Sequence, residues 1–296
     1  MRRHRKNYKF FENFSYFVPN GTQIVVLILL FVCGSVIGSI VVSLLGSLMH
    51  LGIEYSMLIS YPISFIPPMM YAASASHRNE LFDPEYPLDR NGFGSLGGWK
   101  AAVLVVLATV AAGVMTDLVN SVMPDTPEWF DKVMEQLTGG KFIIDLICVS
   151  IFAPICEEWL CRGMFMRGLL NFRKKDGTRG IRPVYAILIS AALFALIHMN
   201  PWQAVPAFIL GVLFGYVYYR TGSLKLTMLM HCTNNTIALV LAHIDSFKDA
   251  ESWIDILGTR LYGIVFVACG LLLVLIIRLF ERSIPQQTDP TDGEAA

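Results

Sequence analysis

The sequence predicts an all-α fold, a polytopic membrane bundle of about eight transmembrane helices with both ends on the cytoplasmic side. Three observations lead to this prediction. Of the 296 residues, 54% are hydrophobic and 16% are charged, and the mean hydropathy is +0.54, far from a soluble domain of this length. Apolar stretches of bilayer length recur along the chain. Lys and Arg are concentrated in every second loop between these stretches. The net charge of zero gives no indication of a nucleic-acid partner.

Eight apolar windows divide the chain. The first follows a basic start that resembles a signal peptide, but it is much longer than a secretory hydrophobic core and lacks a small-residue cleavage site, so we expect a retained first span. We predict a basic cytoplasmic N-terminus (1–23), one transmembrane domain (24–280) and a disordered cytoplasmic tail (281–296) too polar to fold. The windows are Ile24–Met49, Tyr55–Ala75, Ala101–Met123, Phe142–Met166, Val184–Met199, Trp202–Tyr219, Leu224–Ile244 and Leu261–Leu279.

The basic residues predict which side each loop faces. With a cytoplasmic N-terminus, 18 of the 23 Lys and Arg fall on the cytoplasmic side, four fall outside and Arg162 lies within a span. The cytoplasmic side of a membrane protein carries the excess of basic residues, so we expect N-in, C-in topology. Compact loops and no eukaryotic retention signal favour a bacterial cytoplasmic membrane.

Small residues and prolines predict how the helices pack. Gly34 and Gly38 in the first span, and Gly211 and Gly215 in the sixth, are spaced for close helix contact. Prolines at 62, 67, 68 and 154 should kink or break the second and fourth spans. The segment 125–137 is expected to form a short interfacial helix. All six cysteines lie in apolar windows, where we expect free thiols.

The fourth window carries three charges in an apolar surrounding: Glu157, Glu158 and Arg162. A charge at mid-depth of a bilayer costs about 2.5–3.5 kcal/mol on insertion scales. Residues four apart share a helix face, so Glu158 and Arg162 can pair, whereas Glu157 points about 100° away. The pair would make the charges tolerable and leave Glu157 free to act; alternatively, all three only pack the helices.

Two other windows supply polar partners at four-residue spacing. Phe194 and His198 lie in the fifth, where Phe194 would orient the histidine ring, and His231 and Asn235 lie in the seventh. A single histidine on an apolar helix face is more often a hydrogen-bonded core residue than a catalyst. Counted at about 1.5 Å per residue from the cytoplasmic loops, however, these side chains and Glu157 lie roughly 12–22 Å deep. We therefore expect them to meet in one pocket.

Such a pocket suits hydrolysis. Glu157 can take a proton from water as general base while His198 holds the water, and His231 and Asn235 can stabilise an oxyanion. No HExxH motif is present, but Glu157, His198 and His231 could instead bind zinc as two histidines and a carboxylate. We favour the mechanism that requires no cofactor and keep zinc as the alternative.

The residues in these three windows resemble a known family. CEEWLCRG (156–163), FALIH (194–198) and HCTNN (231–235) are similar to the EExxxR, FxxxH and HxxxN motifs of the CAAX prenyl protease and bacteriocin-processing (CPBP, Abi) membrane proteases. The resemblance covers about residues 140–240. It implies an eight-helix intramembrane endopeptidase, described in the family as a metalloprotease or as a glutamate-dependent enzyme, that acts on a membrane-associated peptide or protein. It does not identify the substrate.

Two other functions fit the same residues. One is a non-catalytic membrane scaffold or a bacteriocin-immunity or regulatory protein that retains the fold. The other is a proton-coupled transporter, since buried Glu, His and Arg also mark proton pathways. The sequence lacks the paired, broken half-helices that transporter repeats produce.

Overall fold

The computed structural model describes residues 11–50, 55–78, 87–138, 140–244 and 252–284, and these residues form helices with no β-strand. The elements are η1 (Glu12–Phe14), α1 (Gly21–Met49), α2 (Ser56–Arg78), η3 (Gly94–Leu96), α3 (Gly97–Asn120), α4 (Glu128–Thr138), α5 (Phe142–Asp145), η4 (Leu146–Phe152), α6 (Ala153–Glu158), η5 (Trp159–Met166), α7 (Arg167–Leu170), α8 (Pro183–Leu196), α9 (Pro201–Thr221), α10 (Leu224–Ala242), α11 (Trp253–Leu257) and α12 (Thr259–Ser283).

Each of the eight predicted windows is helical, and the fourth is the continuous run from α5 to α7. Four helices of the described chain are long and apolar enough to cross a bilayer by length and composition: α1, η3 with α3, α9 and α12. The shorter α8 is also apolar. The all-α membrane bundle is confirmed, while eight crossings and the N-in, C-in orientation stay predictions.

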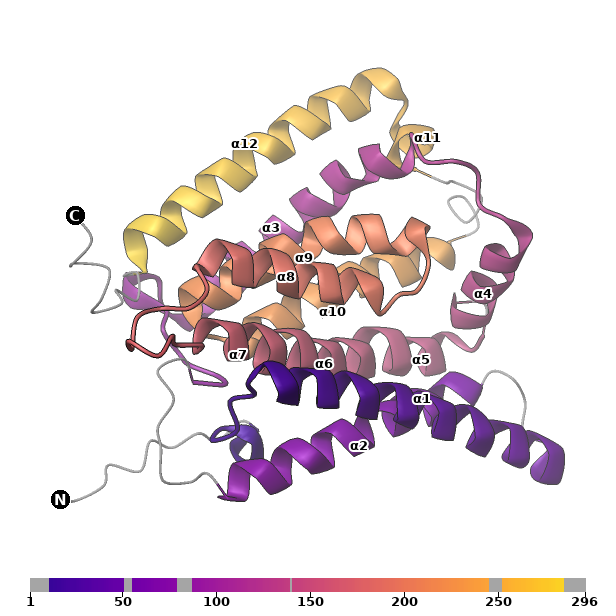
Figure 1. Ribbon diagram of the computed structural model, residues 1–296. Coiled ribbons are helices and arrows are strands. Elements are labelled where there is room, and N and C mark those ends of the chain that lie inside the picture. Colours follow the sequence, from indigo (N-terminus) through magenta and orange to yellow (C-terminus); the bar gives the residue numbers. More distant parts are fainter. Residues whose placement is uncertain (1–10, 51–54, 79–86, 139, 245–251, 285–296) are drawn as a thin grey trace.

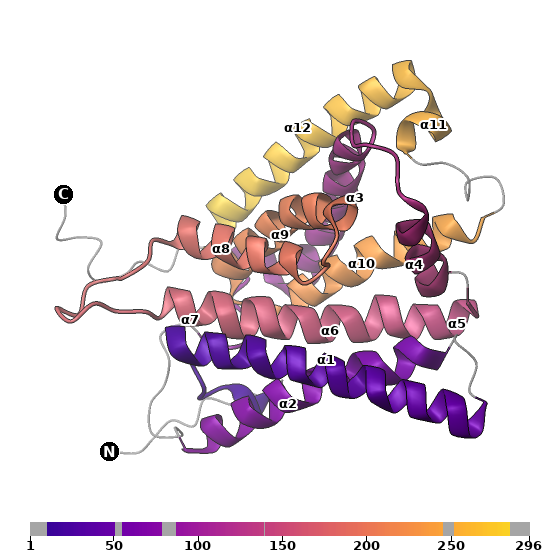
Figure 2. The ribbon, with the colours of Figure 1, turned by 45° about the vertical axis from the view of Figure 1, so that its right-hand side comes forward.

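The α5–α7 run lies at the centre of the molecule. In Figure 1 and Figure 2 it separates the crossed pair α1 and α2 from a group formed by α8, α9 and α10, and α3 and α12 cover the far side of that group. One apolar core joins α1 and α2 to the central run, and a second joins α3, α9, α10 and α12. The polar residues of the central run are thus enclosed between two packed layers.

Large apolar side chains on the outer helices remain exposed. Along α1 they include Leu29 and Ile40, with exposed fractions of 58% and 54%, and along α12 Ile264 and Leu271, with 63% and 69%. Such long apolar faces on a monomer indicate contact with lipid. The protein is therefore an integral multi-pass membrane protein.

Glycines bring α1 and α2 into close contact, as predicted. A Cβ atom on Gly34 would lie 2.4 Å from the carbonyl oxygen of Ser64, and one on Gly38 would lie 2.7 Å from that of Ser60. Both distances are too short for carbon and oxygen, so only glycine fits at these two positions. On α9, a Cβ on Gly215 would lie 3.1 Å from Ile187 of α8, which makes that contact tight as well.

Side chains tie together helix ends that were predicted to face the cytoplasm. Asp89 accepts a hydrogen bond from the backbone N–H of Leu224, at 2.9 Å, and pairs with Lys225 at 2.8 Å, so a preceding loop caps the start of α10. Arg220, at the end of α9, donates to the carbonyl of Ile284 at 2.7 Å, just after α12. These contacts fix the register of α9 and α10, which bear on the site.

The predicted domain limits differ from the structure at both ends. Within the predicted N-terminus, residues 11–20 pack on the bundle: Phe17 is fully buried and its carbonyl accepts a hydrogen bond from Arg167. The predicted tail begins at residue 281, but α12 continues to Ser283 and Ile284 is 2% exposed. The apolar side chains at these positions are buried in the bundle. The polar composition of the flanking residues gave no indication of this burial. Residues 1–10 and 285–296 lie outside the described residues.

The expected effects of the prolines are only partly present. Pro62, Pro67 and Pro68 lie inside α2, which continues as one helix through all three. Pro154 instead follows η4, a π-helical segment with i to i+5 hydrogen bonds. The interfacial helix expected at 125–137 is present as α4, whose Phe130 is 8% exposed and packs on Trp202 of α9.

The glycine contact of α1 with α2 predicts the outcome of a single added methyl group. Gly34→Ala should force the two helices apart and destabilise the protein by about 1–3 kcal/mol, the usual cost of overpacking. Gly46→Ala is the matched control, because it lies on the same helix with no atom within 4 Å of the added Cβ. Thermal unfolding in detergent should show a lower Tm for Gly34→Ala alone; equal Tm values would contradict the close contact.

Candidate active site

The two glutamates lie on α6 between two π-helical segments, η4 and η5. Glu157 is 8% exposed, and Glu158 and Arg162 are fully buried. A π-helical insertion shifts the face that later residues present, and such insertions are frequent at functional sites. Glu157 therefore faces the protein interior rather than lipid.

Glu158 and Arg162 form the predicted ion pair, and the pair extends to two further helices. Arg162 donates to Oε1 of Glu158 at 2.7 Å, and its other terminal nitrogen donates to the carbonyl of Gly211 on α9 at 3.0 Å. Nδ1 of His231 on α10 lies 3.1 Å from the same glutamate oxygen. Three helices are thus connected through one guanidinium and one carboxylate.

Phe194 forms the apolar side of this network. Its ring centroid lies 4.5 Å from the guanidinium carbon of Arg162, a cation–π contact. The rings of His198 and His231 both meet it nearly edge-on, with centroids 5.2 Å away. The predicted orientation of His198 by Phe194 is present, and the same phenylalanine also positions His231.

His198 lies in a turn rather than on the predicted helix. The window 184–199 was expected to be helical to its end, but α8 ends at Leu196. Met199 follows with a φ of 54°, and Asn200 caps α9 by accepting from the N–H of Gln203 at 2.8 Å and donating to the carbonyl of His198 at 2.8 Å. The cap at Asn200 before Pro201 stops the preceding helix and sets where the histidine lies.

Hydrogen bonds fix the tautomer of both histidines. Nδ1 of His198 lies 2.8 Å from the carbonyl of Phe194, and because a carbonyl can only accept, Nδ1 carries the hydrogen. Nδ1 of His231 faces the carboxylate of Glu158. In the neutral ring each Nε2 then holds a lone pair. His231 can donate from Nε2 only as an imidazolium.

Pro154 explains how Asn235 is held. In η4 the backbone N–H of Ala153 donates to the carbonyl of Cys148, five residues earlier. The next such donor would be Pro154, which has no N–H, so the carbonyl of Val149 is left for a side chain. Asn235 donates to it at 2.8 Å, and Asn234 donates to the side-chain oxygen of Asn235 at 3.2 Å. One amide hydrogen of Asn235 remains for a ligand.

Glu157 has a partner that sequence reasoning missed. Its Oε1 accepts a hydrogen bond from the phenol of Tyr61 on α2, and its Oε2 makes no hydrogen bond within the described chain. Tyr61 lies 96 residues before Glu157, in a window with no polar pair, so no sequence signal indicated it. Asn200 and Asn234 were also missed, although an Asn-Pro pair before a helix is a recognisable cap.

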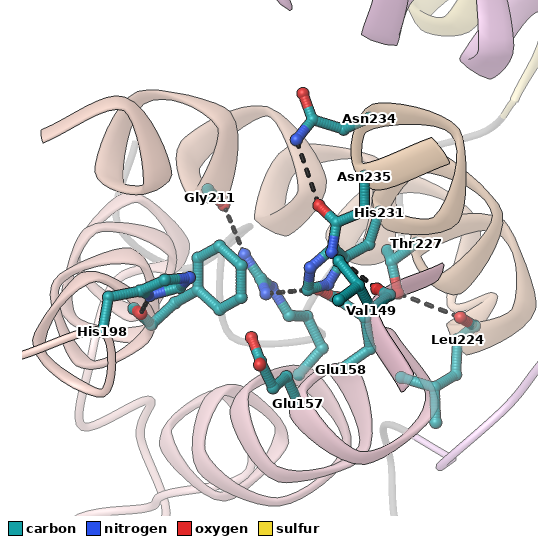
Figure 3. Close-up of polar contacts among 12 residues, drawn as sticks. Val149, Glu157, Glu158, His198, Gly211, Leu224, Thr227, His231, Asn234 and Asn235 are labelled. Carbon is teal, nitrogen blue, oxygen red and sulfur yellow. Dashed lines mark hydrogen bonds and ion pairs between the residues drawn. The ribbon is translucent and has the colours of Figure 1, made fainter. Parts of the chain in front are cut away.

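Figure 3 shows Glu157, His198, His231 and Asn235 gathered in one region from three segments of the chain. The four predicted residues thus lie in one region. Among the described residues, no three His, Cys, Asp or Glu side chains are placed to hold a metal ion. The protein partners of both histidines contact Nδ1 and that of Glu157 contacts Oε1, which is compatible with zinc ligation through Nε2 and Oε2, so the zinc alternative stays a prediction.

The cysteines beside the glutamates form no part of this network. All six cysteines are free thiols, as expected. Cys156 and Cys161 are buried in the packing around α6 and η5, with 9% and 0% exposure. A buried thiol among apolar groups is usually inert.

Comparison with known proteins agrees with the motifs. Residues 139–237 match the model of the type II CAAX prenyl endopeptidase Rce1-like family. The membrane-embedded CAAX protease MroQ of Staphylococcus aureus (strain USA300) is 27% identical over 150 residues. The match covers 50% of this chain and 55% of that relative, about half of each. No solved structure matches the chain.

The matched region includes α5 to α10 almost entirely and contains all four predicted catalytic residues. It also agrees with the range of about 140–240 over which the motifs were found. Over residues 139–237 the chain is therefore similar to the CAAX prenyl protease and bacteriocin-processing family of membrane proteins.

Proposed function

We propose that the protein is an intramembrane endopeptidase that hydrolyses a membrane-associated protein or peptide. The single observation that supports this most directly is the division between the two glutamates. Glu158 is neutralised by Arg162 at 2.7 Å, whereas Oε2 of Glu157 is buried and has no hydrogen-bond partner among the residues that the structure describes. A buried carboxylate oxygen beside an imidazole is suited to activate water.

The reaction proceeds without a covalent intermediate. Oε2 of Glu157 takes a proton from water, and Nε2 of His198 accepts a hydrogen bond from the same water. The resulting hydroxide attacks the scissile carbonyl carbon. As the carbon–nitrogen bond breaks, Glu157 returns the proton to the leaving amine, so no net proton is consumed.

Asn235 and His231 stabilise the oxyanion. Asn235 has one amide hydrogen beyond the one given to Val149, and its orientation is fixed before substrate arrives, which is the condition for efficient electrostatic stabilisation. His231 joins it as an imidazolium, with Glu158 facing its Nδ1. These residues together require no metal.

The substrate is proposed only as a class. The similar bacterial protein is named a CAAX protease and the matching family a prenyl endopeptidase. The first peptide to try is therefore a prenylated one that ends in Cys, two aliphatic residues and a variable last residue. The same peptide without its prenyl group is the matched control. Cleavage of both would extend the class to unmodified membrane peptides.

Loss of the general base predicts loss of cleavage. Glu157→Gln should lower the rate by about 10²–10⁴-fold, since general-base catalysis contributes that much. The measurement is mapping of new peptide termini in cells that express the wild type or the variant, with Glu281→Gln on exposed α12 as control. Identical termini in wild type and Glu157→Gln would instead support a scaffold or immunity role.

The buried pair of Glu158 and Arg162 predicts a loss of thermal stability when one of its charges is removed. Arg162→Leu leaves Glu158 buried and unpaired, which should cost about 3–5 kcal/mol, and Glu158→Gln in addition should restore part of the Tm. Glu157→Gln removes no ion pair and should unfold near the wild-type temperature. Thermal unfolding in detergent checks this, and an unchanged Tm for Arg162→Leu would mean that the pair is dispensable for folding.

The metal-free mechanism predicts insensitivity to chelators. Purified active protein should contain less than one zinc per chain, and prolonged treatment with a chelator should leave the cleavage rate unchanged. Metal analysis by mass spectrometry and rate measurement on the same sample check this. Loss of activity on chelation with recovery on adding zinc would favour the zinc alternative, with Glu157, His198 and His231 as ligands.

A further inference from the structure

The phenol of Tyr61 donates a hydrogen bond to the side chain of Glu157. Tyr61 lies outside the matched region 139–237. It lies on α2 and reaches Oε1, while Oε2 of the same carboxylate has no partner within the described chain. The two oxygens of the proposed base are therefore not equivalent. One accepts a hydrogen bond from the phenol, and the other has no hydrogen-bond partner among the described residues.

The position of the phenol is set by the α1–α2 pair. The ring of Tyr61 packs on that of Phe65 one turn later, with centroids 5.4 Å apart, and Phe65 packs on Phe31 of α1 at 4.9 Å. Phe65 is 1% exposed. Gly34 and Gly38 hold α1 against Ser64 and Ser60, the residues that flank Tyr61. The hydroxyl is thus held by a rigid apolar framework.

In the hydrogen bond between Tyr61 and Glu157, the chemistry of the two groups determines which one donates. A phenol in contact with a carboxylate donates its hydrogen, and a hydrogen bond to a charged acceptor is about twice as strong as a neutral one. An oxygen that already accepts a strong hydrogen bond is a poorer acceptor for a second proton. The carboxylate also cannot rotate about its terminal bond without breaking the contact.

We propose that Tyr61 is a positioning residue of the endopeptidase site, which holds Oε1 of Glu157 so that Oε2 is the oxygen that takes the proton from water. The proposal rests on the proposed function, because it assigns a role relative to the proposed base. It extends the site to α2, beyond the three motifs.

Tyr61→Phe tests the role by removing one oxygen and keeping the ring. With a peptide that spans a cleavage position found by terminus mapping, kcat should fall about 10–100-fold, as for a misplaced catalytic group, and KM should change by less than about two-fold because Tyr61 is not proposed to bind substrate. Tyr71→Phe is the matched control: it lies on the same helix and packs on Phe17 with ring centroids 5.7 Å apart. It should retain wild-type kcat.

Two further measurements separate positioning from folding. Incorporation of 4-aminophenylalanine at position 61 restores a donor on the same ring and should recover most of the lost kcat. The infrared difference spectrum of wild type minus Glu157→Gln isolates the carboxylate bands of Glu157. Those bands should shift in Tyr61→Phe and stay in place in Tyr71→Phe, whatever the substrate.

Each failure has its own signature. Unshifted carboxylate bands or a wild-type kcat in Tyr61→Phe would overturn the role of Tyr61 while leaving the endopeptidase intact. A lower kcat that the amino analogue does not recover, together with a lower Tm, would assign Tyr61 to packing alone. Full cleavage by Glu157→Gln would overturn the proposed function, and the role of Tyr61 with it.

Discussion

The buried contact of Glu158 with Arg162 is the interaction on which the rest of the site depends. Both side chains are fully buried, and removing two charges from water costs several kcal/mol each unless their hydrogen-bonding capacity is used. Arg162 meets this cost with a carboxylate, the carbonyl of Gly211 and the face of Phe194. Because these partners come from α6, α9 and α8, neutralising the charge also fixes three helices relative to one another.

The position of Gly211 shows how packing and electrostatics are coupled. A Cβ at that position would lie 3.2 Å from the Arg162 guanidinium and from the Phe194 ring. The glycine lets the backbone of α9 approach closely enough for its carbonyl to accept from the arginine. A helical carbonyl is thereby shared with a side chain, which is tolerable in the interior of a bundle where no water competes.

Irregular helix geometry supplies the remaining acceptors. The carbonyl of Val149 is freed by the π-helical register of η4 together with Pro154, and Asn235 occupies it. The carbonyl of Cys161 in η5 similarly accepts from Ser190 of α8 at 2.9 Å. Within a membrane a freed backbone group must be satisfied by protein, so these departures from α-helix join neighbouring helices at the level of the site.

The sequence by itself determined the membrane bundle, the ion pair of Glu158 with Arg162 and the motif residues of the site. Hydropathy over a window and four-residue spacing are local properties that need no knowledge of the neighbouring helix. Only the tertiary structure decided that His198 lies in a turn, that Phe194 contacts both histidines, and that Tyr61 meets Glu157. These depend on which helices are adjacent and at what register, and that is set by contacts such as Gly34 on Ser64 between residues 30 apart in the chain. A sequence pattern within one helix does not indicate which residues of another helix it contacts.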